Sequence, residues 1–541
     1  MRAAFWAATF GFFTTFFSCF APGALGAYYK RPVSQGGLGL SQETLSDGGA
    51  FAVTGTILMR VLAGPMCDIM GARLTFVTLL LIGIPGMIIF AFCTSGATFI
   101  LGRVIIGLSL ATFVTCQVWC SQFFSKGIVG TVNATAGGWG NLGGAITLLL
   151  MPQIVNGFID ATTASMGNAG SIDFSWRMAM IIPAFMHLAT ATYIFFARDL
   201  PDGNYKELEK AGVKQKSKGA MGAGQLFALG FSNTNALIML ITYGLCFGVE
   251  LCMNNKLTPY FTRYYGMNPR IAGPLAACFG LMNIFARSWG GILSDFMMKK
   301  AGLRGRIWAM WIIQTIEGFL CMLMGFVTVG MDGPDEPGFK TQIQQGVFTH
   351  SDGVVYTVPG TLGEVGKCAS ELIRAPATAL VNGVSQPFPI AENTLVMIQD
   401  PGTTCVHNGG TLGLTMFVMI CFSICVQMAE GLHYGIVPYI SRTALGVCSG
   451  MVGAGGNAGA LISSKYIVGA RNLDAGFIRL GIVIMAGSLT MHGIFFPGHG
   501  GMLLPKTLNY DPQLIKEEAG QKGSDELDFT KSNQGGITAQ A

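Results

Sequence analysis

Charged residues are scarce in this chain, and their scarcity determines the class of protein. Of 541 residues only 11% are Asp, Glu, Lys or Arg, and 51% are hydrophobic, whereas a soluble domain usually has about 25% charged residues. The net charge of +5 is spread over loops and forms no basic stretch of the kind that binds nucleic acid. The composition therefore indicates a membrane protein and gives no reason to expect a nucleic-acid partner.

The sequence also lacks the motifs of enzymes and cofactor proteins. It has no His and Cys cluster at metal-ligand spacing, no nucleophile elbow and no nucleotide-binding loop. Of its 14 cysteines, twelve lie in or beside apolar segments, where a small, soft side chain is ordinary packing. We therefore expect no enzymatic activity, no metal and no bound cofactor.

Long hydrophobic runs, in contrast, recur along the whole chain. Each is about 20 residues long, which is the length that a helix needs to cross a bilayer. The first run is too long and too rich in Phe for a signal peptide. We predict an all-α membrane protein with twelve transmembrane helices, at 5–27, 48–67, 74–94, 97–118, 129–155, 176–197, 232–252, 271–293, 307–330, 411–430, 445–467 and 476–497.

Two polar stretches divide these helices into domains. Residues 198–231, rich in Lys, Glu and Gly, predict a cytosolic linker between an N-terminal six-helix bundle (1–197) and a C-terminal one (232–497). Residues 331–410 carry no long apolar run and predict an extracellular loop with a small folded core around 369–384. Residues 498–541 predict a disordered tail.

The positions of Lys and Arg predict the orientation of the chain. Most basic loop residues lie on the side of the amino terminus, which is the usual cytosolic excess. Both termini are therefore predicted to be cytosolic. This topology puts Cys368 and Cys405 of the 331–410 loop outside the cell, where a disulfide between them would be allowed.

The two halves repeat the same motifs. "RVLAGPMCD" (60–68) and "RSWGGILSD" (287–295) share Arg-x3-Gly-x3-Asp, and "GWGNLGG" (138–144) is echoed by "GAGGNAGA" (453–460). Matched motifs in two six-helix halves indicate a pseudo-symmetric transporter, with its substrate site between the halves near the membrane midplane.

The turn after the second predicted helix carries a known signature. Gly64-x3-Asp68-x2-Gly71-x-Arg73 resembles the cytosolic motif that the major facilitator superfamily has between helices 2 and 3. Asp295 ends the corresponding motif of the second half. The resemblance implies the fold of that superfamily, with two pseudo-symmetric six-helix bundles, and assigns these residues to the inner gate.

The glycine-rich runs are similar to the paired signatures of the nitrate/nitrite porter family within that superfamily. "FGVELCMNN" (247–255), "FGLMNIFARSWGGILSD" (279–295) and residues 426–460 look like eukaryotic high-affinity nitrate transporters. The resemblance covers all twelve helices and fails over 331–410, where the family usually has a shorter connection. It implies proton-coupled uptake of nitrate, and also nitrite, across the plasma membrane, and it raises the question of an accessory subunit, which some plant relatives use.

Arg60 and Arg287, one in each half, are the predicted anion ligands. Nitrate is a planar monoanion, and a planar guanidinium can donate parallel hydrogen bonds to two of its oxygens while keeping its charge at any pH. The resemblance adds further pocket residues, and it makes no choice among Phe12, Phe13, Phe16 and Phe17. The added residues are Asn141, Asn457, Tyr243, Phe247 and Phe113.

Three carboxylates stand inside predicted membrane helices: Glu250, Glu317 and Glu430. Such residues commonly relay protons or pair with Arg. All three are candidates for proton coupling, and the sequence does not choose among them. Two other hypotheses stay open, namely a porter for another small anion and a nitrate-sensing receptor on a transporter scaffold.

Overall fold

The computed structural model describes residues 2–201, 222–265, 269–328, 409–441, 444–469, 472–497 and 499–505, with single residues of 203–210, Met267 and six strands between 345 and 399. Cys368 and Cys405, and with them the proposed disulfide, lie outside these described residues.

Twelve membrane crossings can be followed in the described part of the chain. Ten helical stretches are long and apolar enough to span a bilayer, but Val129–Phe195 and Ile271–Thr328 contain 67 and 58 residues, far more than one crossing needs. Each turns back at a glycine with positive φ, Gly167 (70°) or Gly302 (64°), a conformation that glycine adopts without a steric penalty. Counting these two stretches twice gives the predicted twelve.

The N-terminal half contains the first six crossings. Its elements are α1 (Arg2–Ala24), α2 (Gly26–Lys30), η1 (Val33–Gln35), α3 (Gln42–Met70), α4 (Ala72–Ala91), α5 (Gly96–Ser109), α6 (Thr112–Phe123), α7 (Val129–Ala179) and α8 (Ile181–Phe195).

The C-terminal half contains the other six, and α10 (Ala223–Phe231) precedes it. Its elements are α11 (Thr234–Gly244), α12 (Phe247–Tyr265), α13 (Pro269–Leu281), η2 (Met282–Ile284), α14 (Ala286–Thr328), α15 (Gly409–Ile436), η3 (Val437–Tyr439), α16 (Leu445–Ile462), η4 (Ser463–Val468), α17 (Leu473–Ser488), η5 (Leu489–Gly493), β7 (Phe495–Phe496) and β8 (Gly500–Gly501).

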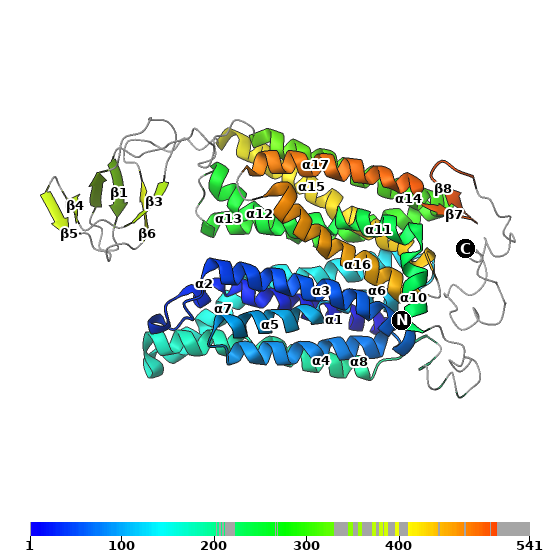
Figure 1. The fold of residues 1–541 in the computed structure, drawn as a ribbon, viewed down its shortest axis with the longest axis horizontal. Coiled ribbons are helices and arrows are strands. Elements are labelled where there is room, and N and C mark those ends of the chain that lie inside the picture. The colour runs from blue at the N-terminus through cyan, green and yellow to red at the C-terminus, as the bar shows by residue number, and fades with distance from the viewer. Residues whose placement is uncertain are drawn as a thin grey trace.

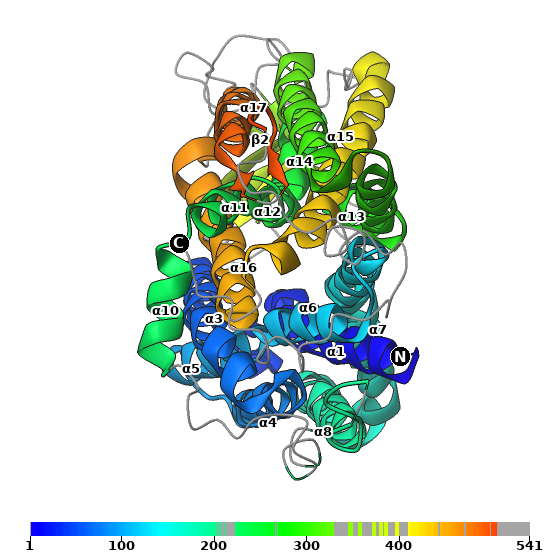
Figure 2. The ribbon, with the colours of Figure 1, turned by 90° about the vertical axis from the view of Figure 1, so that its right-hand side faces the viewer.

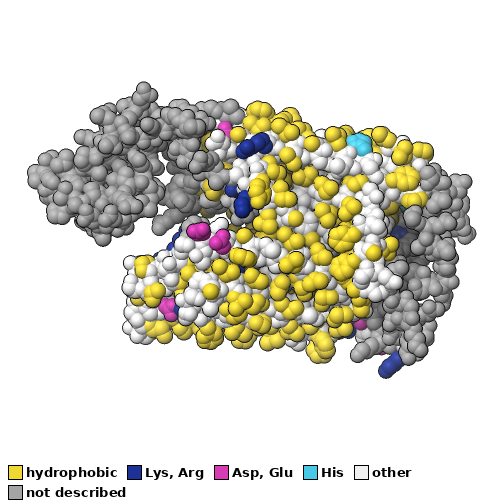
Figure 3. Space-filling view, viewed as in Figure 1, with side chains coloured by type: hydrophobic (Ala, Val, Ile, Leu, Met, Phe, Trp, Pro, Cys, Tyr) yellow, Lys and Arg dark blue, Asp and Glu magenta, His cyan; other side chains and the backbone are white. Residues whose placement is uncertain are grey.

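The two halves lie side by side with their helices running in the same general direction. Figure 1 shows the N-terminal half (blue to cyan) below the C-terminal half (green to orange), and Figure 2 shows the same two groups end-on. Hydrophobic side chains cover much of the lateral face, and the charged ones lie nearer the two ends (Figure 3). This is the surface expected of a protein surrounded by lipid.

Several helices are longer than the sequence predicted. The seventh crossing, predicted at 232–252, runs through α11 and α12 to Tyr265, and the fifth, predicted to end at 155, continues to the turn at Gly167. The hydrophobic pattern detects only the apolar part of a helix. The added part of α12 includes the polar residues Asn254, Asn255 and Lys256, and Lys256 donates a 2.6 Å hydrogen bond to the carbonyl of Gly469.

The 331–410 segment contains an antiparallel six-stranded sheet, which is the departure from an all-helical chain. Its strands lie in the order β3-β6-β1-β2-β4-β5 across the sheet. They span residues 345–399, a longer part of the chain than the core expected around 369–384. Figure 1 shows the sheet at the opposite end of the molecule from β7 and β8. The strands are β1 (Gln345–Thr349), β2 (Val355–Pro359), β3 (Ser370–Arg374), β4 (Thr378–Val381), β5 (Val384–Pro387) and β6 (Leu395–Gln399).

The first residues of the expected tail belong to the C-terminal half. Gly500 and Gly501 pair with Phe496 and Phe495, and the buried Met502 accepts hydrogen bonds of 2.9 and 2.8 Å from Arg304 through its carbonyl. The disorder expected farther along concerns residues 506–541, which lie outside the described part of the chain.

Candidate functional site

Arg60 lies on α3 of the N-terminal half, but its partners come from the C-terminal half. Its side chain is fully buried, and Nη1 donates a 2.7 Å hydrogen bond to the carbonyl of Gly453 on α16. With the amide of Asn457 oriented to satisfy both groups, the amide oxygen accepts bonds of 2.8 Å from Nη1 and 3.2 Å from Nε. Among the described residues no carboxylate forms an ion pair with Arg60, and its Nη2 has no hydrogen-bond partner.

Arg287 occupies the matching position on α14 and is equally buried. Its Nη1 forms an ion pair with Glu430 of α15, and its Nη2 donates a 3.0 Å hydrogen bond to the hydroxyl of Tyr243. Its Nε has no partner among the described residues. The two arginines therefore occupy equivalent positions, but among the described residues only the positive charge of Arg287 is compensated by a carboxylate.

Phe113 of α6 lies close to both guanidiniums. Its ring centroid is 4.8 Å from Cζ of Arg60 and 5.7 Å from Cζ of Arg287, both within the range of a cation–π contact. The two positive groups are therefore no farther apart than the sum of these distances. The structure thus brings the predicted pair to one aromatic ring at the interface of the halves.

Tyr243 and Phe247 line the same place from the C-terminal half. Their rings are nearly parallel to that of Phe113, with interplanar angles of 15° and 6° and centroid distances of 6.1 and 6.2 Å. Phe247 also lies 5.4 Å from Cζ of Arg60. Parallel aromatic faces next to two guanidiniums are an arrangement suited to contact with a planar anion.

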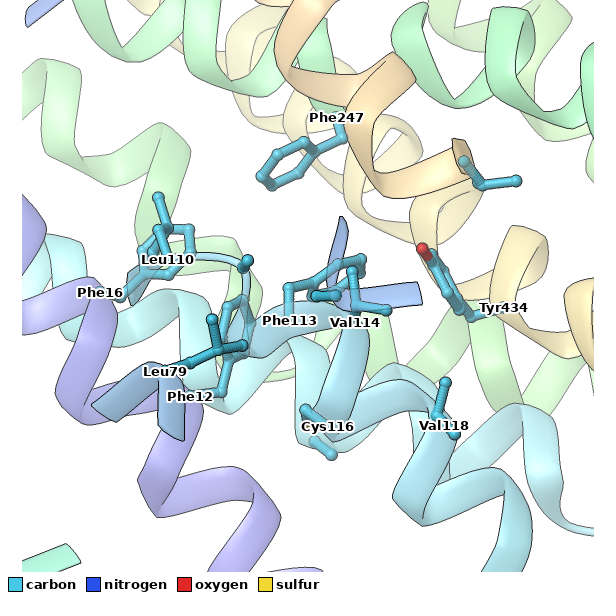
Figure 4. Packing of buried hydrophobic residues seen from close by; sticks show 14 of the residues in the cluster. Phe12, Phe16, Leu79, Leu110, Phe113, Val114, Cys116, Val118, Phe247 and Tyr434 are labelled. Carbon is cyan, nitrogen blue, oxygen red and sulfur yellow. The ribbon is translucent and has the colours of Figure 1, made fainter. Parts of the chain in front are cut away.

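Two further aromatic residues complete this group: Tyr434, which sequence reasoning did not single out, and Phe12, one of the four phenylalanines among which it made no choice. Tyr434 packs edge-on against Phe113 (5.0 Å between centroids) and Tyr243 (5.3 Å), and Phe12 packs against Phe113 at 5.2 Å. Figure 4 shows Phe113 between Phe12 and Tyr434, with Phe247 projecting from the other half. Tyr434 follows Glu430 by four residues, which places both on one helix face, and that spacing was the available signal.

The glycine-rich runs make room for these side chains. A Cβ at Gly137 would lie 3.0 Å from Nε of Arg287, and one at Gly138 would lie 3.0 Å from its Cβ. In the other half, a Cβ at Gly453 would lie 3.3 Å from Phe113 and 3.5 Å from Cδ of Arg60. Each glycine run therefore packs against the arginine of the opposite half, which explains why the two motifs occur as pairs.

Asn141 lies near the site but contacts a different partner from its counterpart Asn457. Its Nδ2 donates a 3.3 Å hydrogen bond to Oε2 of Glu250 on α12, while Asn283 donates a 2.6 Å bond to Oε1. Asn283 is another buried residue that the sequence analysis did not single out. Glu250 is thus held by two amides, one from each half, and Oδ1 of Asn141 has no partner among the described residues.

Glu317 is the third buried carboxylate and the least compensated. It is fully buried on α14, and neither of its carboxyl oxygens has a hydrogen-bond partner in the described part of the chain. A buried charge without a partner is strongly unfavourable. The arrangement therefore suits a side chain that carries a proton or gives one up in response to its surroundings.

Asp68 and Asp295 link the halves at one end of the bundle. Asp68 accepts hydrogen bonds from the backbone N–H groups of Gly446 (2.8 Å) and Val447 (3.1 Å) at the start of α16. Asp295 accepts from Gly130 (3.0 Å) and Thr131 (2.7 Å) at the start of α7. Each carboxylate therefore caps a helix N-terminus of the opposite half, where the helix dipole favours a negative charge.

The other members of the predicted gate have different surroundings: Gly64 contacts the opposite half, whereas Gly71 and Arg73 act within their own half. Gly64 lies against Gly446 and Val447, where an added Cβ would be 2.8 Å from backbone atoms of α16. Gly71 has φ 89° at the turn between α3 and α4. Arg73 pairs with Asp199 at 2.6 Å. Asp199 follows α8 in the same half as Arg73, so the structure does not bring Arg73 to the contact between the halves.

Comparisons with known proteins show what this chain is similar to. A family model described as the Major Facilitator Superfamily matches residues 8–339. The chain is 33% identical to Nitrate transporter 2.1 of Chlamydomonas reinhardtii over 501 residues, which cover 91% of this chain and 74% of that protein. It is also 33% identical to High affinity nitrate transporter 2.5 of Arabidopsis thaliana over 505 residues, covering 93% and 81%.

A solved structure shows the same fold. The E. coli fucose:proton symporter superimposes with a TM-score of 0.56 at 10% sequence identity, covering 90% of this chain and 97% of that chain. At this low identity the likeness concerns the arrangement of the helices alone.

Proposed function

The chain belongs to the major facilitator superfamily and, within it, to the nitrate/nitrite porter family, and from this premise we propose that it carries nitrate, and also nitrite, across a membrane with protons. Members of this superfamily are transporters and not enzymes. The observation that supports the proposal most directly is the pair of buried arginines that both contact the ring of Phe113.

The charge of this site favours a small anion. Arg60 has only neutral hydrogen-bond partners among the described residues, and its guanidinium cannot lose its proton to relieve burial. A buried ion without a counterion costs several kcal/mol, and a bound monoanion would offset that cost. Nη2 of Arg60 and Nε of Arg287, which have no hydrogen-bond partner among the described residues, are left to donate to it.

The interface between the halves supports an alternating-access mechanism. Arg60 and Arg287 each belong to a different half, so the anion would stay between them while the halves rock. The Asp68 and Asp295 contacts would hold the halves together at one end and break when that end opens. We propose that this end faces the cytosol, with both termini, and that the membrane is the plasma membrane.

Protons would supply the driving force. Moving one negative charge inward costs about 2.3 kcal/mol per 100 mV of negative-inside potential, so two protons per nitrate would reverse the electrical penalty. Glu250, Glu317 and Glu430 are buried in the half that contains Arg287, and they are the groups proposed to carry protons. No cofactor is required, and an accessory subunit stays a prediction.

Nitrate-evoked current in a heterologous cell tests the proposal. Wild type should give an inward current that grows as external pH falls, and Arg60→Lys should lose at least nine-tenths of it, because an ammonium cannot donate two coplanar bonds. Current that ignored pH would contradict proton coupling, and full activity of the Lys variant would contradict the role of Arg60.

The choice of anion needs its own test. Purified protein in proteoliposomes should take up labelled nitrate, and unlabelled nitrate and nitrite should compete for uptake. If another small anion competed and was transported much better than either, the protein would be a porter for that anion on the same fold.

A further inference from the structure

We propose that the Glu430 carboxylate pairs with Arg287 in the place that the substrate anion takes when it binds. When the substrate binds, it replaces Glu430 as the partner of Arg287, and Glu430 takes up a proton. The inference rests on the proposed function, because it assumes that the transported anion contacts Arg287. It assigns the proton that is linked to substrate binding to Glu430, whereas the sequence alone did not choose among the three buried carboxylates.

The partners of the two arginines support this role. Arg60 donates to a carbonyl and an amide, whereas Arg287 at the matching position donates to a carboxylate. A carboxylate, like nitrate and nitrite, places negatively charged oxygens in a plane, and here one of them, Oε2, pairs with Nη1 of Arg287. In this conformation Glu430 therefore fills the role that a bound anion would have.

The packing of α15 indicates that the exchange takes place in the Glu430 side chain. A Cβ at Gly290 would lie 2.7 Å from Cα of Met428, and one at Gly431 would lie 3.0 Å from the backbone N of Gly291. The backbone on both sides of Glu430 is thus pressed against α14. Because Arg287 and Glu430 also belong to the same half, rocking of the halves alone does not separate them.

The surroundings of Glu430 make its charge dependent on Arg287. Oε1 of Glu430 has no partner among the described residues, and its side chain is completely buried. Two more carboxylates act on it electrostatically, Glu250 from α12 and Glu317 from α14. The other titratable groups nearby are Tyr243 and Cys246, from α11 and the turn after it, and His433 and Tyr434 of α15 itself.

The exchange can be written as a balanced step. Before it, the Glu430 carboxylate is paired with the Arg287 guanidinium. One anion and one proton then enter, the anion accepts the Arg287 hydrogen bonds, and the proton forms an O–H bond on Glu430. If Glu430 stayed charged, it would be a buried anion without a counterion beside other carboxylates, which is strongly unfavourable. Binding of one anion is therefore linked to uptake of one proton.

The test measures nitrate binding to the purified full-length protein by calorimetry between pH 5.5 and 8.5. In wild type the affinity should fall as pH rises, approaching about tenfold per pH unit, because one proton is bound together with the anion. Glu430→Gln keeps the size of the side chain but not its charge, so it should bind nitrate with an affinity that does not vary with pH. Asp173→Asn is the matched control: this carboxylate is partly exposed and pairs with Arg177 on α7, so the variant should keep the wild-type dependence of nitrate affinity on pH.

Transport by the same variant gives a second readout. In proteoliposomes Glu430→Gln should exchange internal for external nitrate but should no longer accumulate nitrate in response to a pH gradient. If this variant does not fold, Glu430→Asp replaces it: its shorter carboxylate should release Arg287 more readily, giving tighter nitrate binding than wild type at pH 7.5 while the slope remains.

Several results would overturn the proposal. One is a Glu430→Gln variant whose nitrate affinity depends on pH as in wild type. Another is loss of nitrate binding by that variant when it is folded. The third is loss of the pH dependence of nitrate affinity in Glu317→Gln instead. Wild-type protein that binds nitrate without pH dependence would overturn this inference and leave the proposed substrate standing. Wild-type protein that binds no nitrate at any pH would overturn both.

Discussion

At the scale of single residues, the site is asymmetric although the sequence motifs are symmetric. Arg60 and Arg287 occupy equivalent positions, yet only Arg287 has a carboxylate partner. Before the anion enters, Glu430 compensates the charge of Arg287, and among the described residues the charge of Arg60 is the one left to attract a small anion.

Phe113 is expected to affect substrate affinity more than folding. It contacts both guanidiniums, and a cation–π contact contributes about 0.5–2 kcal/mol, so Phe113→Leu should raise the KM for nitrate by roughly 2- to 30-fold. Phe90→Leu is the control, because Phe90 is a buried ring packed against Tyr29 and Phe99. Concentration-dependent uptake should show an unchanged KM for the control, and equal KM values in both variants would contradict the assignment.

Asn457→Asp tests whether Arg60 must lack an internal counterion. The new carboxylate would stand within hydrogen-bond distance of Arg60 and would compete with the substrate. Hydrogen bonds to charged groups contribute about 1.5–3 kcal/mol, so nitrate binding should weaken by roughly 10- to 150-fold. Asn457→Ser, which adds no charge, should weaken it much less. Calorimetric titration at neutral pH distinguishes the two, and similar losses would mean that charge at this position does not matter.

At the scale of secondary-structure elements, glycine determines how closely the helices approach the site. Gly456 of α16 faces the aromatic residues of the other helices, and a Cβ there would lie 2.6 Å from Phe247 and 3.0 Å from Tyr243. Overpacking of this kind usually costs 1–3 kcal/mol.

Gly456→Ala should therefore reduce nitrate transport by about tenfold or more at equal membrane expression, because the Phe247 and Tyr243 rings must move. The matched control is Gly273→Ala on α13, where an added Cβ meets nothing within 4 Å. Uptake per unit of surface-expressed protein provides the measurement. Normal transport by Gly456→Ala would show that these rings need not keep their positions.

The site elements that could be predicted from the sequence are those whose spacing repeats. Arg60, Arg287 and the glycine runs were found because each motif occurs once in each half. Tyr434 and Asn283 have no such repeat, and their contacts join segments that are far apart in the chain. The partner of Arg73 was out of reach for the same reason, since Asp199 lies 126 positions away. The sheet within 331–410 was underestimated because its strands are only four or five residues long.

At the scale of the whole molecule, the structure is closed at the end marked by Asp68 and Asp295. Both carboxylates cap helices of the opposite half, and Gly291 and Gly64 let the backbones of α14 and α3 approach α7 and α16 there. The guanidiniums are 0–1% exposed, so the site cannot be reached from that end without separating these contacts. The conformation is therefore one in which that entrance is shut.

Neutralising either aspartate should open that end. Asp68→Asn and Asp295→Asn each weaken charge-assisted bonds to backbone N–H groups, which contribute about 1.5–3 kcal/mol, and each should shift the population toward the open state by roughly tenfold. Asp295→Asn should have the larger effect, because Asp295 also accepts from the Thr131 hydroxyl (2.6 Å) and pairs with the buried Arg306 at 2.8 Å.

Distances between spin labels at the ends of α3 and α16, and of α14 and α7, would measure the shift. A longer distance should become populated across both pairs in either variant, because each half moves as a body. Lengthening confined to the mutated pair would mean that the two caps act separately. The double variant then distinguishes two kinds of opening. In a single rigid rocking motion, the effects of the two substitutions on the free energy of opening add. In local fraying, each pair of labels responds only to the substitution of its own aspartate.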